Sequence, residues 1–150
     1  MKTKVLIVNS VNDFITERRI ERLISNPLTA NFEIFHSYAL RDLNEKATLN
    51  EMTFRIELGI KSFQPEYVIF HTGASFHNQP DIYQKCVINL KQKYDNIKFG
   101  YEPRLSNECV NYFDNLEIFD KDKKTSEIIR VLFFNVFNRP IDDKLWISQQ

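Results

Sequence analysis

Short runs of apolar residues alternate along the chain with longer stretches in which apolar residues recur at helical spacing. The apolar runs predict strands at residues 5–8, 32–35, 67–70, 97–101 and 116–119. The run at 67–70 is apolar throughout and lies between Pro65 and a turn signal at residues 72–75. Such a strand is typical of the centre of a parallel sheet, where both faces are covered. We therefore expect residues 67–70 to form the central strand.

Helices are expected between the strands, at residues 14–25, 49–63, 80–94, 106–113 and 126–138. Their starts carry capping residues: Asn12 or Asp13, Thr48, Ser106, and Thr125 or Ser126. Glu51 follows Thr48 by three residues and completes a capping box. Residues 40–47 are compatible with a loop or with one or two helical turns. The apolar positions of the first helix are Phe14, Ile20, Leu23 and Ile24.

This alternation predicts an α/β domain in which helices cover both faces of five parallel strands, as a three-layer α/β/α sandwich. Right-handed crossover connections favour the strand order 2-1-3-4-5 of flavodoxin-like folds. The 150 residues suit one domain, residues 1–150, that ends in a short tail from about residue 139.

Charge and composition limit the kinds of binding partner and the cellular compartment that we expect for this protein. Twenty basic and twenty acidic residues balance, so no overall attraction to nucleic acid or to an acidic membrane is expected. Cys86 and Cys109 form no CxxC motif, which indicates two reduced thiols. The apolar run at residues 5–8 is too short for a signal sequence or a membrane span. We expect a cytoplasmic protein without nucleic-acid or membrane partners.

Polar residues follow the predicted strands at the edge of the sheet where α/β proteins bind ligands. The candidates for this polar rim are Asn9, Ser10, Asp13, His71, Thr72, Gly73, Ser75 and Glu102. His71 directly follows the central strand, and two interpretations stay open. It is either a base or ligand tuned by its neighbours, or a structural histidine bonded to nearby backbone.

The chemistry available to this rim is limited. Three glycines in the whole chain provide no glycine-rich phosphate loop, so we expect no nucleotide cofactor. Ser10 lies where GDSL-type esterases carry their nucleophile, but the Gly-Asp-Ser motif and a late histidine are absent. The spacing of His71 and His77 gives no metal motif. We therefore assign no catalytic residue, cofactor or metal, and keep as the alternative a small-molecule binder or hydrolase that uses Ser10, His71 and Ser75.

Three stretches resemble response-regulator receiver domains. Residues 5–10 (VLIVNS) are similar to the first receiver strand, which ends in two acidic residues that hold Mg²⁺. Residues 64–71 (QPEYVIFH) are similar to the central strand, whose final Asp is phosphorylated, and residues 115–121 (NLEIFDK) are similar to the strand that brings the family's Lys. The resemblance covers roughly residues 4–138 and implies a flavodoxin-like fold and a role in signalling.

The residues that take part in receiver phosphorylation are replaced in this chain. Asn9 and Ser10 stand where the resemblance implies the acidic pair, and His71 stands at the position of the acceptor Asp. An amide and a hydroxyl do not supply the charge that Mg²⁺ requires, and without the metal and the Asp no acyl phosphate forms. The resemblance therefore implies a pseudo-receiver, a non-catalytic signalling or regulatory module that acts through protein–protein contacts.

The last predicted helix has more apolar residues than one buried face needs. At ~100° per residue, a broad arc suited to the core contains Ile128, Ile129, Leu132, Phe133 and Val136. Val131, Phe134 and Phe137 fall outside this arc. We expect these three residues either to pair two subunits as a homodimer, together with Trp146, or to be covered by the tail through Leu145, Trp146 and Ile147.

Overall fold

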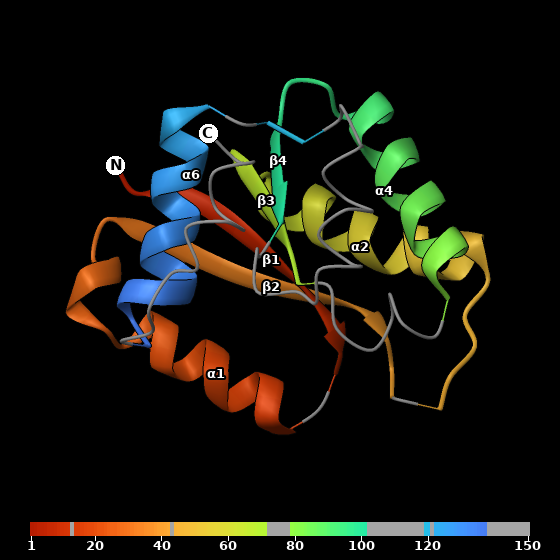
Figure 1. Ribbon diagram of the computed structural model, residues 1–150, viewed down its shortest axis with the longest axis horizontal. Coiled ribbons are helices and arrows are strands. Elements are labelled where there is room, and N and C mark those ends of the chain that lie inside the picture. Colours follow the sequence, from red (N-terminus) through yellow and green to blue (C-terminus); the bar gives the residue numbers. More distant parts are fainter. Residues whose placement is uncertain (13, 43, 72–78, 102–118, 121, 138–150) are drawn as a thin grey trace.

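The computed structural model describes residues 1–12, 14–42, 44–71, 79–101, 119–120 and 122–137. Four strands form one parallel sheet: β1 (Thr3–Val11), β2 (Phe32–Leu40), β3 (Tyr67–Phe70) and β4 (Lys98–Tyr101). Their order is β2-β1-β3-β4, so β3 lies between β1 and β4 (Figure 1). The α/β class and the relative order expected for these four strands are confirmed.

The fifth expected strand falls on residues 116–119, of which only Phe119 lies in the described part of the chain. Its neighbour Asp120 lies beside β4, because the Asp120 N–H donates to the Phe99 carbonyl at 2.7 Å and the Phe99 N–H donates to the Asp120 carboxylate at 2.7 Å. The chain thus returns to the edge of β4 at this point. The short helix expected at 106–113 lies outside the described residues.

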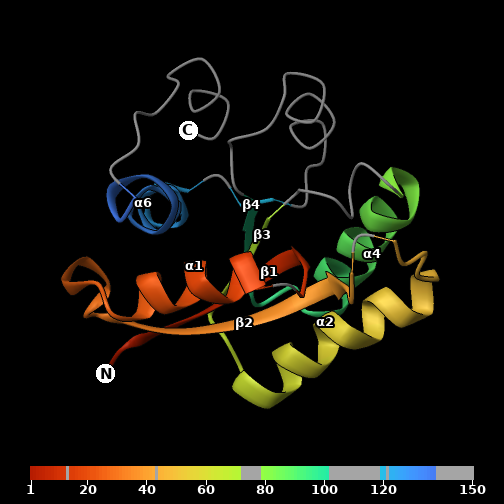
Figure 2. The same cartoon turned by 90° about the horizontal axis from the view of Figure 1, so that it is seen from below.

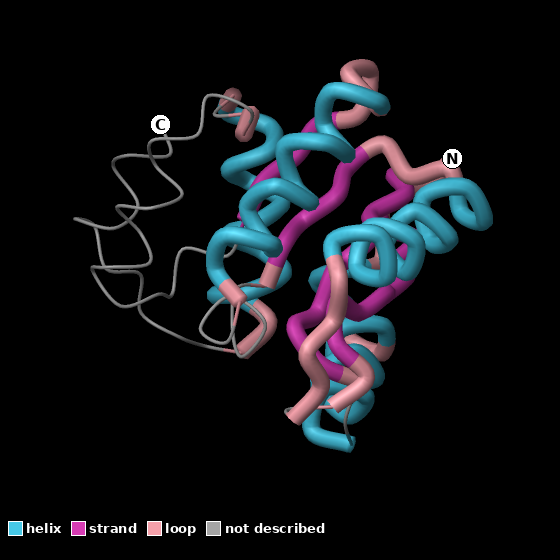
Figure 3. Tube along the Cα trace, turned by 90° about the vertical axis from the view of Figure 1, so that its right-hand side faces the viewer, coloured by secondary structure: helices cyan, strands magenta, loops and turns pink. Residues whose placement is uncertain are grey.

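Helices pack against both faces of the sheet. On one face lie α1 (Phe14–Ile24) and α6 (Lys123–Arg130), and on the other lie α2 (Leu49–Phe63) and α4 (Pro80–Lys93) (Figure 1, Figure 2). Figure 3 shows the strands between these two groups of helices. A 3-10 helix (Pro27–Thr29) links α1 to β2, and a π turn (Val131–Asn135) extends α6. In the described part of the chain, every helix is too short or too polar to cross a lipid bilayer.

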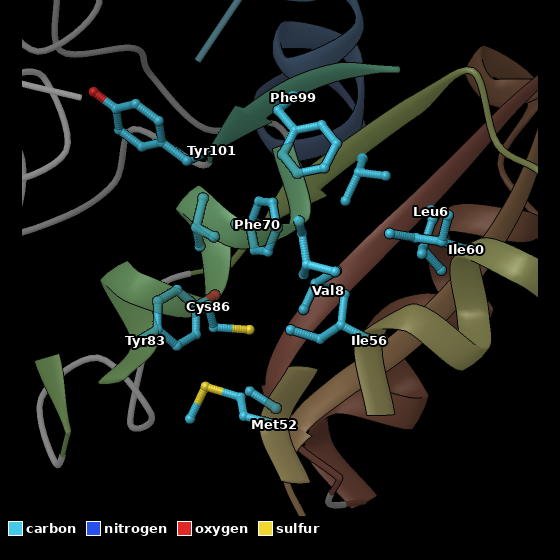
Figure 4. Packing of buried hydrophobic residues seen from close by; sticks show 14 of the residues in the cluster. Leu6, Val8, Met52, Ile56, Ile60, Phe70, Tyr83, Cys86, Phe99 and Tyr101 are labelled. Atoms are coloured by element: carbon cyan, nitrogen blue, oxygen red, sulfur yellow. The ribbon is translucent and has the colours of Figure 1, made fainter. Parts of the chain in front are cut away.

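The sheet separates two apolar clusters, because successive side chains of a strand point to opposite faces. Leu6 and Val8 belong to the α2–α4 cluster, whereas Val5 and Ile7 belong to the α1–α6 cluster. Figure 4 shows the α2–α4 cluster, in which the helices contribute Met52, Ile56, Ile60, Tyr83 and Cys86. Strand β3 contributes to both clusters, with Val68 and Phe70 in the first and Tyr67 and Ile69 in the second.

Cys86 is a free cysteine that is buried in the α2–α4 cluster. Burial raises the pKa of its thiol to about 11, so the thiol stays protonated at neutral pH. Cys109, the other cysteine of the chain, lies outside the described residues.

The strongest local signal in the sequence, the capping box at Thr48, forms as expected. The Glu51 N–H donates to Thr48 Oγ1 at 3.1 Å, and the Thr48 N–H donates to Glu51 Oε1 at 3.4 Å.

Strand β2 is longer than expected: it runs five residues beyond the alternation at 32–35 and pairs with β1 up to Leu40. Ser37, Ala39 and Leu40 are all buried there, so no alternation of polarity marks this half of the strand. The described residues between Leu40 and Thr48 form no helix.

The apolar face expected for α1 included Phe14 and Ile24, and this expectation is wrong at both ends of the helix. Ile20 and Leu23 are buried, as their spacing predicts. Phe14 is 64% exposed and Ile24 is 58% exposed, so neither belongs to the core. The buried side chains of α1 lie in its second half, and its first turn presents a large apolar ring to solvent.

The last helix begins three residues earlier than expected. Asp122 caps it, because the Asp122 carboxylate accepts a hydrogen bond from the Thr125 N–H at 3.1 Å. The Asp122 carboxylate also accepts from the Thr125 hydroxyl at 2.7 Å. Thr125 is therefore a helical residue rather than the cap, and Ser126 lies one turn inside the helix.

A change of helical pitch corrects the expected position of Phe134. From Val131 to Asn135 the backbone forms a π turn, which holds more residues than an α-helical turn. Positions calculated at α-helical spacing no longer apply beyond Arg130, and Phe134 is 3% exposed within the α1–α6 cluster. The expectation that Phe134 lies outside the core is therefore wrong. Val131 and Phe137 are half-buried and pairing through them stays a prediction.

The segment after β2 is held by a buried carboxylate. Glu45, whose side chain is 8% exposed, pairs with both Arg41 and Arg55. Arg55 also donates to the Ala39 carbonyl at 2.9 Å, which ties α2 to the end of β2. Burial alone would raise the pKa of Glu45, but the hydrogen bonds from Arg55 and Arg41 outweigh it and lower the pKa to about 2.

We predict that Glu45→Gln lowers the free energy of unfolding by about 2 kcal/mol at pH 7. In the wild type this contribution is complete above the ordinary carboxyl pKa of 4.5 and is lost as the pH falls toward about 2. Urea denaturation at a series of pH values checks both points. The difference between wild type and variant should disappear at the acid end, and the exposed Glu33→Gln serves as the control; a difference that persists there would contradict the prediction.

Candidate functional site

The carboxyl ends of β1 and β3 meet at the polar rim expected from the sequence. Val8 pairs with Phe70 in the parallel ladder, and the His71 N–H donates to the Val8 carbonyl at 2.8 Å. This bond places His71 next to Asn9 along the edge of the sheet. Asn9 is 2% exposed, and its amide Nδ2 donates to the Ser37 carbonyl of β2 at 3.5 Å. The structure thus brings Asn9 and His71 together and fixes both to neighbouring strands.

No hydrogen bond joins Ser10 to His71 among the described residues. The alternation of β1 does not continue to its end, because Val8 and Val11 both lie in the α2–α4 cluster. The ring of His71 lies on the α1 side, where it contacts a residue of that helix. Ser10 is buried, and among the described residues its hydroxyl forms no hydrogen bond. The geometry therefore gives no support to a Ser10–His71 nucleophile and base pair.

Arg19 of α1 completes the contacts around His71. The Arg19 Nη1 lies 2.9 Å from the His71 Nε2. Because a guanidinium donates hydrogen bonds and accepts none, Nε2 must accept, and the ring proton of the neutral imidazole resides on Nδ1. The His71 carbonyl is also bound, since it accepts from the Tyr83 hydroxyl at 3.1 Å. Backbone and side chain of His71 are thus both engaged by neighbouring elements.

The electrostatics of this rim oppose a divalent cation. The described side chains that neighbour His71 include the Asn9 amide and the guanidinium of Arg19, and neither of these two is anionic. In the described part of the chain no cluster of three or more His, Cys, Asp or Glu side chains is arranged to hold a metal. A positive charge 2.9 Å from the ring nitrogen of His71 would repel Mg²⁺ from the acceptor position.

Five of the residues proposed for the rim from the sequence lie outside the described residues: Asp13, Thr72, Gly73, Ser75 and Glu102. Arg19, which contacts His71, is not among the residues expected at the rim, because adjacent charged residues such as Arg18 and Arg19 are typical of an exposed helix face. One signal was present in the sequence. Arg19 lies one turn before the buried Leu23, so it borders the face of α1 that packs on the sheet.

Comparison with known proteins does not identify a family. No protein-family model matches the chain, and no curated protein matches it. Among solved structures, the chain is similar to an F420-dependent methylene-tetrahydromethanopterin dehydrogenase in complex with methylene-tetrahydromethanopterin and coenzyme F420, with 8% identity and a TM-score of 0.38. The match covers 97% of this chain and 62% of that enzyme, so the chain spans less than two-thirds of its length. A similarity at this level carries no functional argument.

We predict that the neutral imidazole of His71 is in the Nδ1–H tautomer. A long-range ¹H–¹⁵N correlation spectrum should show Nε2 as the unprotonated nitrogen, because it accepts from Arg19. Arg19→Gln removes the cation, and its spectrum should shift toward the Nε2–H form that free histidine prefers. Arg18→Gln, one residue away, is the matched control. A dominant Nε2–H tautomer in the wild type would contradict the hydrogen bond.

Proposed function

We propose that this chain is a non-catalytic signalling or regulatory module with a degenerate receiver-like, flavodoxin-like fold, and that it acts through protein contacts. The order β2-β1-β3-β4 agrees with the first four strands of the order 2-1-3-4-5. Packing of helices on both faces agrees with a three-layer sandwich. The fifth strand near 116–119 and the receiver kinship itself are parts of this proposal.

The contact between Arg19 and His71 is the observation that carries the proposal. An active receiver needs a carboxylate acceptor and a bound Mg²⁺ at the end of its central strand. In this chain the corresponding position holds an imidazole whose Nε2 lone pair is already used by a guanidinium. The nitrogen is therefore not available as a nucleophile, and the neighbouring charge has the wrong sign for a metal. Both features favour a module that does not catalyse phosphoryl transfer.

Exposed apolar side chains support a role in protein contacts. Phe54 and Leu58 lie one turn apart on the outer side of α2 and are 62% and 49% exposed. Apolar side chains at i and i+4 share one face of a helix, and patches of this kind often mark interaction sites. For the homodimer expected through the last helix, burial of Phe134 leaves Val131 and Phe137 as the described candidates.

The alternative is a small-molecule binder or hydrolase that uses the polar rim. It receives less support, because the Ser10 hydroxyl forms no hydrogen bond among the described residues and the Nε2 of His71 is bound to Arg19. Ser75, the third residue of this alternative, lies outside the described residues. A binder that needs no nucleophile remains compatible with the rim, and a ligand screen by thermal shift with His71→Ala as the control tests it.

We predict that the protein is not phosphorylated by acetyl phosphate and does not respond to beryllofluoride, each in the presence of Mg²⁺. The intact mass should stay unchanged, and the melting temperature should move by less than about 1 °C, because no complex forms with the folded state. A receiver domain with its acidic pair intact serves as the positive control. A phosphorylated species in the mass spectrum, or a clear thermal stabilisation, would refute the non-catalytic assignment.

For the dimer, we predict a sedimentation coefficient that corresponds to two chains at about 50 μM, a range in which weak pairing is populated. Val131→Asp, in the half-buried π turn, should give a folded monomer because the charge opposes burial between subunits. Phe54→Asp on α2 is the matched control and should leave the dimer intact. Phe134→Asp is unsuitable, because Phe134 is 3% exposed in the core of its own chain. A monomeric wild type would rule out the pairing.

A further inference from the structure

A groove lies between the outer face of α1 and the end of the last helix, where the two approach each other at the lower left of Figure 1. Its volume is about 470 Å³. The residues that line it are Phe14, Ile15, Arg18, Arg19, Arg22 and Phe137. Three of the six are arginines and the other three are apolar, and we call this site the arginine groove. It is separate from the end of β3, although Arg19 borders both.

The positive charge of the arginine groove is not neutralised within the described chain. Among the described residues, Arg18, Arg19 and Arg22 form no ion pair. The acidic residues of α1, Glu17 and Glu21, do not line the groove. Arg18 and Arg22 are one turn apart, and like charges at this spacing destabilise a helix. This arrangement is unfavourable for the isolated chain and favourable once an anion is bound.

Each of the three guanidinium groups is held by one neighbour. The Arg18 guanidinium carbon lies 4.4 Å from the centre of the Phe14 ring, and that of Arg22 lies 4.9 Å from the centre of the Phe137 ring. Arg19 is held by its hydrogen bond to His71. A freely solvated arginine loses rotamer entropy when it binds a ligand, whereas each of these contacts already restricts its side chain. The groove is therefore preorganised for binding.

We propose that the arginine groove binds a small organic phosphate whose phosphate is attached to a flat apolar group. A phosphate carries close to two negative charges at neutral pH and accepts paired hydrogen bonds from guanidinium groups, which suits three clustered arginines better than a single carboxylate does. Phe14 and Ile15 are 64% and 71% exposed and supply apolar surface for the attached group. The volume of about 470 Å³ falls within the range of small-molecule sites.

This proposal does not depend on the pseudo-receiver assignment. The groove uses the outer face of α1, whereas the functional proposal rests on the missing carboxylates and on His71 at the end of β3. Arg19 connects the two, because it lines the groove and holds the imidazole at the same time. A bound phosphate that engages the remaining Arg19 donors would also affect His71, because the Arg19 Nη1 lies 2.9 Å from the His71 Nε2.

The test uses phenyl phosphate as the probe and the full chain in low-salt buffer. Isothermal titration calorimetry should give a Kd below about 1 mM, and the affinities for phenol and for inorganic phosphate should be at least about tenfold weaker. Phenol lacks the charge and inorganic phosphate lacks the ring, so the two controls separate the two halves of the site. Absence of binding at about 10 mM phenyl phosphate, or equal affinity for phenol, would overturn the proposal.

Variants place the binding in the groove. Arg18→Gln and Arg22→Gln alter exposed side chains and should not lower the melting temperature, while each weakens phenyl phosphate binding about tenfold. Lys61→Gln on α2, where the lysine side chain is 63% exposed, removes the same charge elsewhere and should leave the affinity unchanged. An equal loss in Lys61→Gln would mean a general charge effect and refute the site. A phosphotyrosine peptide that binds far more tightly than phenyl phosphate would refute the assignment to a small molecule.

Discussion

The burial of β3 on both faces is the constraint on which the rest of the structure depends. All four of its side chains are at most 7% exposed, and they alternate between the α2–α4 cluster and the α1–α6 cluster. Full burial of a large apolar side chain stabilises a fold by about 1.5–3 kcal/mol, so this short strand, together with β1, links the two cores. With β1 and β4 on its edges, β3 has no exposed side. Its carboxyl end is the first place where a polar side chain is tolerated, and His71 occupies it.

The parts of the fold that could be predicted from the sequence are those with local signals. The apolar run at β3 and the Thr48 capping box needed no knowledge of distant residues. The second half of β2 was missed because both polar and apolar residues are buried there, which removes the alternation that marks a half-exposed strand. Phe134 was wrongly expected outside the core because a helical projection assumes a constant pitch, and no local sequence signal predicts the π turn.

The candidate site, too, could be predicted from the sequence only as far as local signals and strand order reach. Its position at the ends of β1 and β3 followed from topology alone. The contact that decides its chemistry joins residues 52 positions apart in the sequence. Arg19 belongs to a helix face that carries both acids and bases, so its pairing with an imidazole depends on how α1 crosses the sheet. Only the three-dimensional arrangement shows that one guanidinium serves the rim and the arginine groove together.

The π turn has a consequence for how this helix tolerates change in length. It accommodates about one residue more than the α-helical turn that it replaces, and the extra residue rotates everything after it by about 100° around the helix axis. Loss of a single residue between Val131 and Asn135 would restore an even pitch and carry Phe137 away from Arg22. Insertions and deletions, more than substitutions, are therefore the changes to which the far end of this helix is most sensitive.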